Sequence, residues 1–331
     1  MPVILVTGFL GAGKTTLIRE FLGTPDGRDT AVVVNEFGEI GLDQALLAPA
    51  ATGKVALLGQ GCLCCAIRSD LDTTFRALFT DRARGVVPPF RRVVLETSGA
   101  DDPAPVLQTF LSDRALAGEY HLQAVVAVVD AAAGVANLAR SPEAQRQVAV
   151  ADRIVLTKTD LAGAEAAEAA LRVWNPAAPV RAADHGRIDP GFLLAETTLP
   201  PPSALAAEAV AAEGTHTPDL ASFVLRFEGP LPWRALTAAL GLLGEMRGPD
   251  LLRVKGLAAV EGCRGPVVVH AVQHVLHRPL ELEAWPAGEE EATRLVFITR
   301  GGLDRARVEA LFGAVLGLAV QSRATETART K

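Results

Sequence analysis

The sequence predicts a doubly wound α/β domain with a mostly parallel sheet, followed by a smaller α+β domain. Over residues 1–196, short β-branched segments that are apolar on both faces alternate with helical segments, as in a parallel sheet covered by helices. A Pro-rich stretch then interrupts the pattern, and half-exposed strand patterns follow it. A chain of 331 residues exceeds what one ordinary hydrophobic core accommodates, so two domains are expected.

In chain order, the buried-strand segments of the first domain read PVILVT, TAVVVN, VALL, RRVVLET, LQAVVAVVD and DRIVLTK. Their length and the lack of polar alternation indicate strands that are covered on both faces. Helical stretches between them, such as residues 15–22 and 70–79, supply the crossover connections that a parallel sheet requires.

Residues 197–219 are predicted to be a linker, because TTLPPPSALAAEAVAAEGTHTPD combines consecutive prolines with small or polar residues. The second domain, residues 220–331, starts with SFVLRFE, whose alternation is typical of a half-exposed antiparallel strand. A helix over residues 232–246, the strands LLRVKGL, PVVVHAVQHVL and TRLVFIT, and a helix over residues 304–316 follow. These elements predict the smaller α+β domain.

Charge and composition argue against nucleic-acid binding, secretion and a membrane span. The net charge of −6 gives no reason to expect a nucleic acid, whose binders usually carry a basic stripe. The start MPVILVTGFLG lacks the basic segment of a secretion signal, and the weakly charged run over residues 121–139 is broken by Asp130 and Gly134, so neither secretion nor a membrane span is expected. In the reducing cytoplasm, clustered cysteines favour metal binding or catalysis over disulfides.

The stretch GFLGAGKTT follows the first strand and precedes a helical run, as a phosphate-binding loop does. Its glycines let backbone N–H groups surround phosphate oxygens, and the helix N-terminus adds partial positive charge. We expect Lys14 to reach the β- and γ-phosphates and Thr15 to bind Mg²⁺ through its hydroxyl. The alternative is a glycine turn that caps a helix with Thr15 or Thr16. The expected nucleotide contacts are Gly8, Gly11, Ala12, Gly13, Lys14, Thr15 and Thr16.

The segment LTKTDL favours guanine as the base. Asp160 can accept hydrogen bonds from N1–H and from the exocyclic amine of guanine, whereas adenine presents no such pair of donors. The aliphatic part of Lys158 can cover the purine face. Thr157 is the first residue of this base-binding segment and is also an expected nucleotide contact. The alternative is a helix N-cap at Thr159 or Asp160, which is compatible with base binding.

A carboxylate ends the strand RRVVLETSG. Glu96 can hold the Mg²⁺ shell or orient the attacking water, and Gly99 allows the backbone to approach the γ-phosphate. The alternative is an ordinary surface glutamate. With a phosphate loop upstream, we expect Lys14 and Glu96 to serve catalysis.

Three thiols lie close together in GCLCC, in a chain whose remaining cysteine is Cys263. Cys62, Cys64 and Cys65 suit a soft ion, with Zn²⁺ as the default and Cu(I) or Co²⁺ as alternatives. A fourth ligand is absent from the motif, so the site is completed from elsewhere or left open for exchange. A redox dithiol and simple apolar packing are the competing interpretations. The motif lies between VVVNEFGEIGLD and the Glu96 strand, so a bound metal is expected to be coupled to the nucleotide switches.

Together, GFLGAGKTTL, NEFGE, GCLCC, ETSGADDPAPV and LTKTDL resemble the CobW-like P-loop GTPases, a family of proposed metallochaperones; LLRVKG and VQHVLHRPLELEAWP resemble the family's C-terminal domain. The resemblance implies slow GTP hydrolysis linked to transfer of zinc, or in some members cobalt, to a client metalloprotein. It assigns phosphate and Mg²⁺ binding to Lys14 and Thr15, and the second-switch carboxylate to Glu96. Guanine recognition falls to Lys158 and Asp160, and metal binding to Cys62, Cys64 and Cys65.

The sequence departs from the family pattern at several positions. Thr157 replaces the commoner Asn, which is expected to soften base selectivity. Val34 stands where some relatives have a glutamate, and the chain lacks a histidine-rich tract. In HAVQHVLH, His270 and His274 would share one face of a strand. Together with His277, these histidines are interpreted as structural, with a weak second metal site as the alternative. His185 and Cys263 are also interpreted as structural.

The sequence therefore predicts a cytoplasmic GTPase that binds GTP with Mg²⁺, holds Zn²⁺ or Co²⁺ on three thiolates, and recognises a client through its C-terminal domain. No internal arginine finger is evident, so turnover on the order of 10⁻² s⁻¹ or less is expected. The rivals are a small-molecule phosphotransferase with a structural zinc site and a non-enzymatic metal buffer. The sequence leaves the oligomeric state, the client and the fourth metal ligand open.

Overall fold

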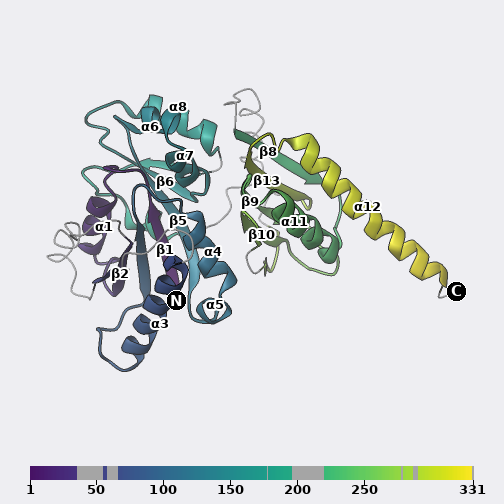
Figure 1. Ribbon diagram of the computed structural model, residues 1–331, viewed down its shortest axis with the longest axis horizontal. Coiled ribbons are helices and arrows are strands. Elements are labelled where there is room, and N and C mark those ends of the chain that lie inside the picture. The colour runs from purple at the N-terminus through teal and green to yellow at the C-terminus, as the bar shows by residue number, and fades with distance from the viewer. Residues whose placement is uncertain are drawn as a thin grey trace. The chain divides into compact units, whose positions relative to one another are not determined.

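The structure is a computed structural model that describes residues 1–35, 55–57, 66–176, 178–195, 220–276, 279–285 and 290–329. The chain divides into two compact units, Met1–Thr198 and Leu199–Lys331 (Figure 1). Each unit is described by itself. The expected linker over residues 197–219 lies outside the described residues.

A parallel sheet forms the centre of the first unit, with strand order β3-β2-β4-β1-β5-β6-β7. Its strands are β1 (Pro2–Thr7), β2 (Thr30–Asn35), β3 (Val55–Leu57), β4 (Arg92–Thr97), β5 (His121–Asp130), β6 (Arg153–Thr157) and β7 (Val180–Ala182). The predicted doubly wound α/β class is confirmed. The order places β1, which leads into the phosphate loop, between β4 and β5.

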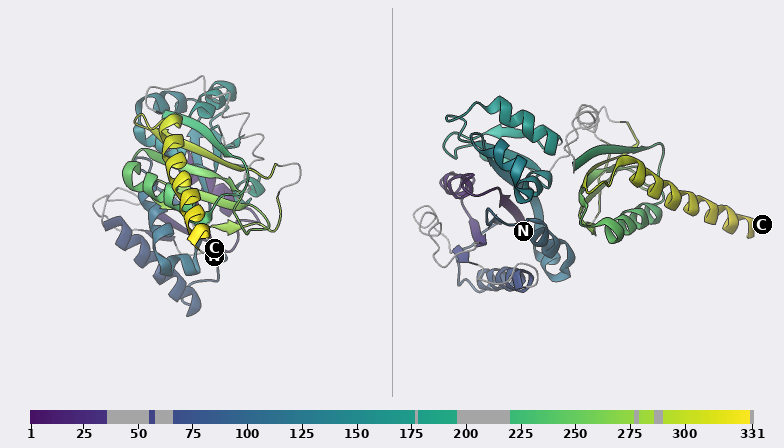
Figure 2. Two further views of the ribbon diagram at one scale, coloured as in Figure 1. Left: turned by 90° about the vertical axis from the view of Figure 1, so that its right-hand side faces the viewer. Right: turned by 45° about the horizontal axis from the view of Figure 1, so that its top comes forward.

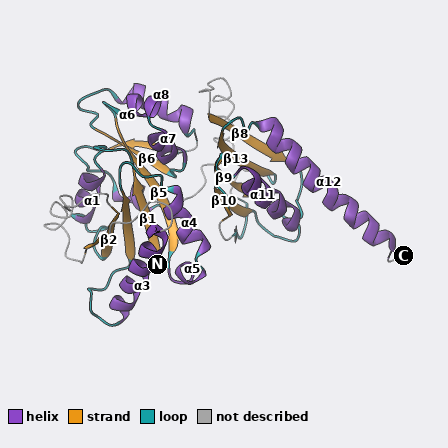
Figure 3. Ribbon diagram, viewed as in Figure 1, coloured by secondary structure: helices purple, strands orange, loops and turns teal. Residues whose placement is uncertain are grey.

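Helices connect these strands and cover the sheet (Figure 3). They are α1 (Lys14–Leu22), α3 (Ala66–Ala83), α4 (Ala104–Ser112), α5 (Arg114–Glu119), α6 (Gly134–Arg140), α7 (Pro142–Ala149), α8 (Ala164–Trp174) and α9 (Pro190–Leu194). On one face of the sheet, Ile4, Val94 and Val126 pack with Leu17 of α1 and Leu193 of α9. The intervening strand residues are equally buried, which explains why the strand segments are apolar on both faces.

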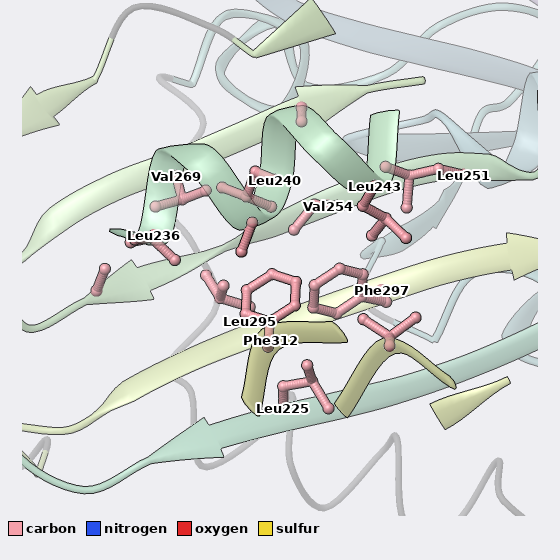
Figure 4. Close-up of a cluster of buried hydrophobic side chains, with 14 of the residues drawn as sticks. Leu225, Leu236, Leu240, Leu243, Leu251, Val254, Val269, Leu295, Phe297 and Phe312 are labelled. Carbon is pink, nitrogen blue, oxygen red and sulfur yellow. The ribbon is translucent and has the colours of Figure 1, made fainter. Parts of the chain in front are cut away.

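The second unit has an antiparallel sheet with strand order β11-β10-β9-β13-β8, and β12 pairs with β10. Its elements are β8 (Leu220–Phe227), α11 (Trp233–Arg247), β9 (Leu251–Ala258), β10 (Val267–Val272), β11 (Val275–Leu276), β12 (Leu280–Glu281), β13 (Thr293–Arg300) and α12 (Arg305–Arg329). Both helices cover the same face of the sheet (Figure 2). Leu240 and Leu243 of α11 and Phe312 of α12 meet Leu225 and Phe297 of the strands in one core (Figure 4).

Two expectations for this unit need correction. The segment PVVVHAVQHVL is not one strand, because β10 turns back into β11 at Gln273 and His274, with Gln273 at φ +53°. His270 on β10 and His274 in the turn therefore do not share a strand face, and His277 lies outside the described residues. The last helix also extends beyond the expected end at residue 316, to Arg329.

Candidate nucleotide-binding site

The site lies at the carboxyl edge of the parallel sheet, where β1, β4, β5 and β6 end. Ligands of doubly wound folds bind at this edge because the loops that leave the parallel strands converge there. The terminal residues of these strands meet one another. The Thr97 hydroxyl donates a hydrogen bond to the Thr7 hydroxyl at 2.9 Å, and Asp130 pairs in register with Thr157.

The loop between β1 and α1 depends on its glycines. Gly8, Gly11 and Gly13 all have positive φ, at +143°, +70° and +95°, a region that side-chain-bearing residues rarely adopt. A Cβ atom on Gly8 would also lie 2.2 Å from the Val128 carbonyl oxygen. The loop can therefore pass tightly over the end of β5 only with glycine at this position.

Lys14 begins α1 and is only 8% exposed. Its ammonium group donates to the Gly8 carbonyl at 2.9 Å and lies 3.4 Å from the Phe9 carbonyl oxygen. The charge that is expected to meet the β- and γ-phosphates is thus held against the loop itself.

Thr15 and Glu96 come together, although they are 81 residues apart in the chain. The Thr15 hydroxyl donates to Glu96 Oε1 at 2.9 Å, and Glu96 is 3% exposed. Glu96 is therefore not an ordinary surface glutamate. Val34 is its register partner on β2 and is fully buried, so this side of the carboxylate is apolar. A hydroxyl and a buried carboxylate are hard oxygen donors of the kind that fits Mg²⁺.

The segment after β4 passes directly against the phosphate loop. A Cβ atom on Gly99 would lie 2.6 Å from the Leu10 amide nitrogen, so this approach requires glycine. Asp101 follows at 3% exposure, and burial raises the pKa of its carboxyl group, although the Ser98 backbone and the Lys14 charge act in the opposite direction. Asp102, directly before Pro103 at the N-cap of α4, accepts a hydrogen bond from the Ala104 amide at 3.0 Å.

Thr157 and Lys158 both contact their surroundings through side-chain hydrogen bonds. The buried Thr157 hydroxyl donates to the Ala12 carbonyl of the phosphate loop at 2.7 Å. Lys158, at φ +56°, pairs with Asp130 through a 2.6 Å contact. Burial raises the pKa of Asp130, but hydrogen bonds from Lys158 and from the amides that follow β5 outweigh it, so the pKa is lowered overall. Asp160 is exposed.

A tight turn over residues 184–187 adds a histidine near Asp160. Asp184 and Arg187 exchange two backbone hydrogen bonds, and Gly186 lies against Thr16 of α1. His185 Nδ1 lies 2.7 Å from Asp184 Oδ1; this hydrogen bond and the charges of Asp184 and Asp160 raise the pKa of the imidazole. The interpretation of His185 as a structural residue stays a prediction.

The thiol cluster Cys62, Cys64 and Cys65 lies outside the described residues. The helix α3 begins at Ala66, directly after it. Within the described parts of the chain, no three His, Cys, Asp or Glu side chains form a group that could hold a metal ion. Cys263 is a free, half-buried thiol. Among the described helices, none has the length and apolar character needed to cross a membrane.

Three contributors to the site were missed by the sequence interpretation: Asp101, Asp130 and Gln147, whose side-chain amide contacts the segment after β4. Asp130 ends a predicted strand at the correct edge, a signal that could have identified it. Asp101 follows the ETSG motif and could have been singled out on that ground. Gln147 lies in a helix without a recognisable motif.

The fold and the site define this protein as a P-loop GTPase: a glycine loop with a buried lysine lies beside a buried carboxylate and a Lys-x-Asp element at one sheet edge. Residues 2–181 match the CobW/HypB/UreG nucleotide-binding domain family, and residues 220–316 match the cobalamin synthesis protein cobW C-terminal domain family. The chain belongs to the CobW family.

Relatives cover almost the whole chain. The zinc chaperone YjiA of Escherichia coli (strain K12) is 34% identical over 90% of this chain and 93% of its own length. The zinc chaperone CobW of Pseudomonas aeruginosa is 32% identical over 93% of this chain and 89% of its own. Among solved structures, Zn(II)-bound YjiA GTPase from E. coli superposes with a TM-score of 0.69 at 29% identity, covering 95% of this chain and 98% of that one.

Proposed function

We propose that this GTPase is a metallochaperone, which holds Zn²⁺ on Cys62, Cys64 and Cys65 and delivers it to a client metalloprotein under control of GTP. The observation that carries the proposal is the combination, in one CobW-family chain, of a P-loop site with a Cys-x-Cys-Cys motif directly before α3. Relatives named as zinc chaperones support the choice of metal. Co²⁺ is the second ion that suits these ligands.

On the nucleotide side, Lys14 and the glycine loop bind the phosphates, Asp160 and Lys158 bind the guanine, and Thr15 with Glu96 holds Mg²⁺. When bound, Mg²⁺ neutralises the charge that develops on the transferred phosphoryl group. Glu96 holds its carboxylate in a fixed direction because it is buried and hydrogen-bonded to Thr15. We propose slow intrinsic turnover, on the order of 10⁻² s⁻¹ or less, as in GTPases that await a partner.

Packing between α3 and α4 supports coupling between the metal and the nucleotide. The helix α3 follows the thiols and α4 follows the segment that contains Gly99. Phe75 of α3 meets Phe110 of α4 edge-to-face, with ring centroids 4.8 Å apart. A close-packed pair of helices moves as one body. A shift of the segment around Gly99 would therefore move α4 and α3 together, and with them the residues before Ala66.

The test is a metal titration. Zn²⁺ and Co²⁺ are titrated into the protein with a non-hydrolysable GTP analogue, with GDP and without nucleotide. We expect the metal affinity to be highest with the GTP analogue, because GTP favours the closed, metal-holding state. Equal affinity in all three conditions would exclude a chaperone and would leave the two rivals, a phosphotransferase with a structural zinc site and a non-enzymatic metal buffer.

A substitution separates the two sites. In Cys64→Ala, the metal affinity is expected to fall sharply while GDP affinity stays unchanged, since the thiols are not part of the P-loop site. Cys263→Ala, which removes the free thiol of the second unit, is the matched control and should leave both affinities unchanged.

A further inference from the structure

We propose that Gln147 is a positioning residue for GTP: its side chain holds the backbone of residues 99–101 in place for the γ-phosphate. The inference concerns the GTP site alone and does not depend on metal delivery. Gln147 comes from α7 and is 1% exposed. Its amide nitrogen donates to the Gly99 carbonyl at 3.1 Å and to the Asp101 carbonyl at 2.9 Å. Both hydrogens of one amide group are therefore used on this segment.

The two contacts define the course of the backbone after β4. Since each peptide unit is planar, fixing a carbonyl also fixes the N–H group on the other side of the same plane. The turn also has a hydrogen bond of its own, in which the Asp101 amide donates to the Ser98 carbonyl at 3.3 Å. Gln147 thus orients the Gly99–Ala100 and Asp101–Asp102 peptide planes, while Gly99 remains against Leu10 of the phosphate loop.

Gln147 also lies near the phosphate loop. It lines a cavity of about 20 Å³ together with Gly8, Phe9 and Ala12 of that loop. One buried side chain therefore adjoins both parts of the backbone that a γ-phosphate would meet, the loop after β1 and the turn after β4.

The helix that carries Gln147 is anchored at both ends. The Ser141 hydroxyl caps its N-terminus by accepting from the Ala144 amide. At its C-terminal end, Asn175 donates to the Val148 carbonyl at 2.8 Å. The neighbouring Arg146 pairs with Asp102 at 3.2 Å, which adds a second link between α7 and the same segment. A rigid support of this kind allows a side chain to fix the geometry of a loop.

The binding of GTP is expected to depend on the ordered turn over residues 99–101, whereas the binding of GDP is not. GDP has no γ-phosphate, so its binding depends on the loop after β1 and on the base site but not on the turn at Gly99. GTP needs the turn already ordered, because a disordered turn would cost conformational entropy on binding. Loss of the Gln147 contacts is therefore expected to weaken GTP binding selectively.

The experiment compares two leucine variants of the same helix. Gln147→Leu removes both donors at similar volume. Gln145→Leu is the matched control, because Gln145 donates to the Leu138 carbonyl at 2.8 Å and is not bonded to residues 99–101. Equilibrium dissociation constants are measured for GDP and for a non-hydrolysable GTP analogue. For Gln147→Leu we expect a roughly tenfold loss for the GTP analogue, the scale of one or two hydrogen bonds, and less than about a twofold change for GDP. Gln145→Leu should leave their ratio unchanged.

A merely structural role for Gln147 would lower both affinities equally or neither, and either result would overturn the proposal. If Gln147→Leu does not fold, amide hydrogen exchange on the wild-type protein decides. Slow exchange at Ala100 and Asp101 without nucleotide is expected, because the amides of both residues donate to Ser98 in a turn that is held before GTP arrives. Fast exchange there, becoming slow only with the GTP analogue, would show that the nucleotide and not Gln147 orders the turn.

Discussion

The Thr157 hydroxyl stabilises the phosphate loop, because it donates a hydrogen bond to the Ala12 carbonyl at 2.7 Å. In Thr157→Val, this buried carbonyl loses its donor without a change in side-chain shape. We expect the free energy of unfolding to fall by about 1–3 kcal/mol, the cost of leaving a buried acceptor unsatisfied. GDP affinity should fall with it, because the loop that holds the phosphates is loosened. Denaturant unfolding and GDP titration measure the two effects.

The same variant tests the expectation that threonine at position 157 softens base selectivity. Since its hydroxyl contacts the phosphate loop, the preference for GTP over ITP should be the same in Thr157→Val and in the wild type. A change in that preference, with unfolding unaffected, would mean that the hydroxyl acts on the base after all. Asp160→Asn is the positive control, because it removes the carboxylate expected to bind the guanine amine.

At Asp130, the lowered pKa predicts a pH-dependent contribution to stability. A carboxyl group whose pKa is lower in the folded state stabilises the fold above its ordinary value of 3.8, and this stabilisation is lost as the pH falls through the folded-state pKa. In Asp130→Asn, an oxygen acceptor for the Ala132 and Ala133 amides remains, but the ion pair with Lys158 is lost. The variant should therefore be less stable than the wild type at neutral pH.

The difference between Asp130→Asn and the wild type should shrink when the pH falls below the ordinary carboxyl value. Urea unfolding of both proteins from about pH 7 down to about pH 2 measures it. A difference that stays constant over this range would show that the charge of Asp130 plays no part. Asp160→Asn serves as a control, because Asp160 is exposed and should not affect stability.

Among the elements, the α3–α4 pair is where the proposed coupling can be tested without touching either site. Phe110 is buried and meets Phe75 edge-to-face. In Phe110→Leu, we expect a stability loss of about 1–2 kcal/mol, from the aromatic contact and the reduced volume. The ratio of Zn²⁺ affinities with GTP analogue and with GDP should move towards one, while GDP affinity is retained.

Arg76→Ala provides the comparison on the same pair of helices. Arg76 links α3 to Asp113 after α4 by an exposed ion pair of 3.3 Å, and such pairs contribute little. This variant should keep the full ratio of Zn²⁺ affinities. If both variants keep it, the path from Gly99 to the thiols does not run through these helices.

How far the elements could be predicted depended on how much of each one is buried. The strands β1, β4, β5 and β6 carry continuous apolar segments because both of their faces are covered, and they were predicted correctly. The short edge strand β7 was missed because its residues are partly or fully exposed and leave no apolar pattern. The hairpin at Gln273 was missed because its turn contains neither Gly nor Asn, the usual turn signals.

The residues of the candidate site also differ in how well the sequence could predict them. Motifs that are local in sequence, around Lys14, Glu96 and Lys158, could be found because their spacing is set by one loop. Asp130 could also have been found, because it ends a predicted strand at the same edge of the sheet. Gln147 contributes through a contact between distant segments, since 48 residues separate it from Gly99. A single sequence has no local signal for such contacts, because the sheet order and the helix packing create them.

For the whole molecule, the two units each have a hydrophobic core of their own. In the first, the sheet packs on α1 and α9; in the second, the sheet packs on α11 and α12. Cores of this kind support separate cooperative unfolding. Because the P-loop residues all belong to Met1–Thr198, a nucleotide should stabilise that unit alone.

Calorimetry of the full chain checks this division. We expect two transitions, of which GDP with Mg²⁺ raises only one. At a ligand concentration of about 100 Kd, binding contributes about 2.7 kcal/mol, which corresponds to about 5–10 °C for a unit of roughly 200 residues. Phe312→Leu, in the core of the second unit, should lower the other transition and leave the GDP-sensitive one in place. A single transition that responds to both changes would mean that the units unfold together, so that GTP binding could reach the second unit through their shared stability.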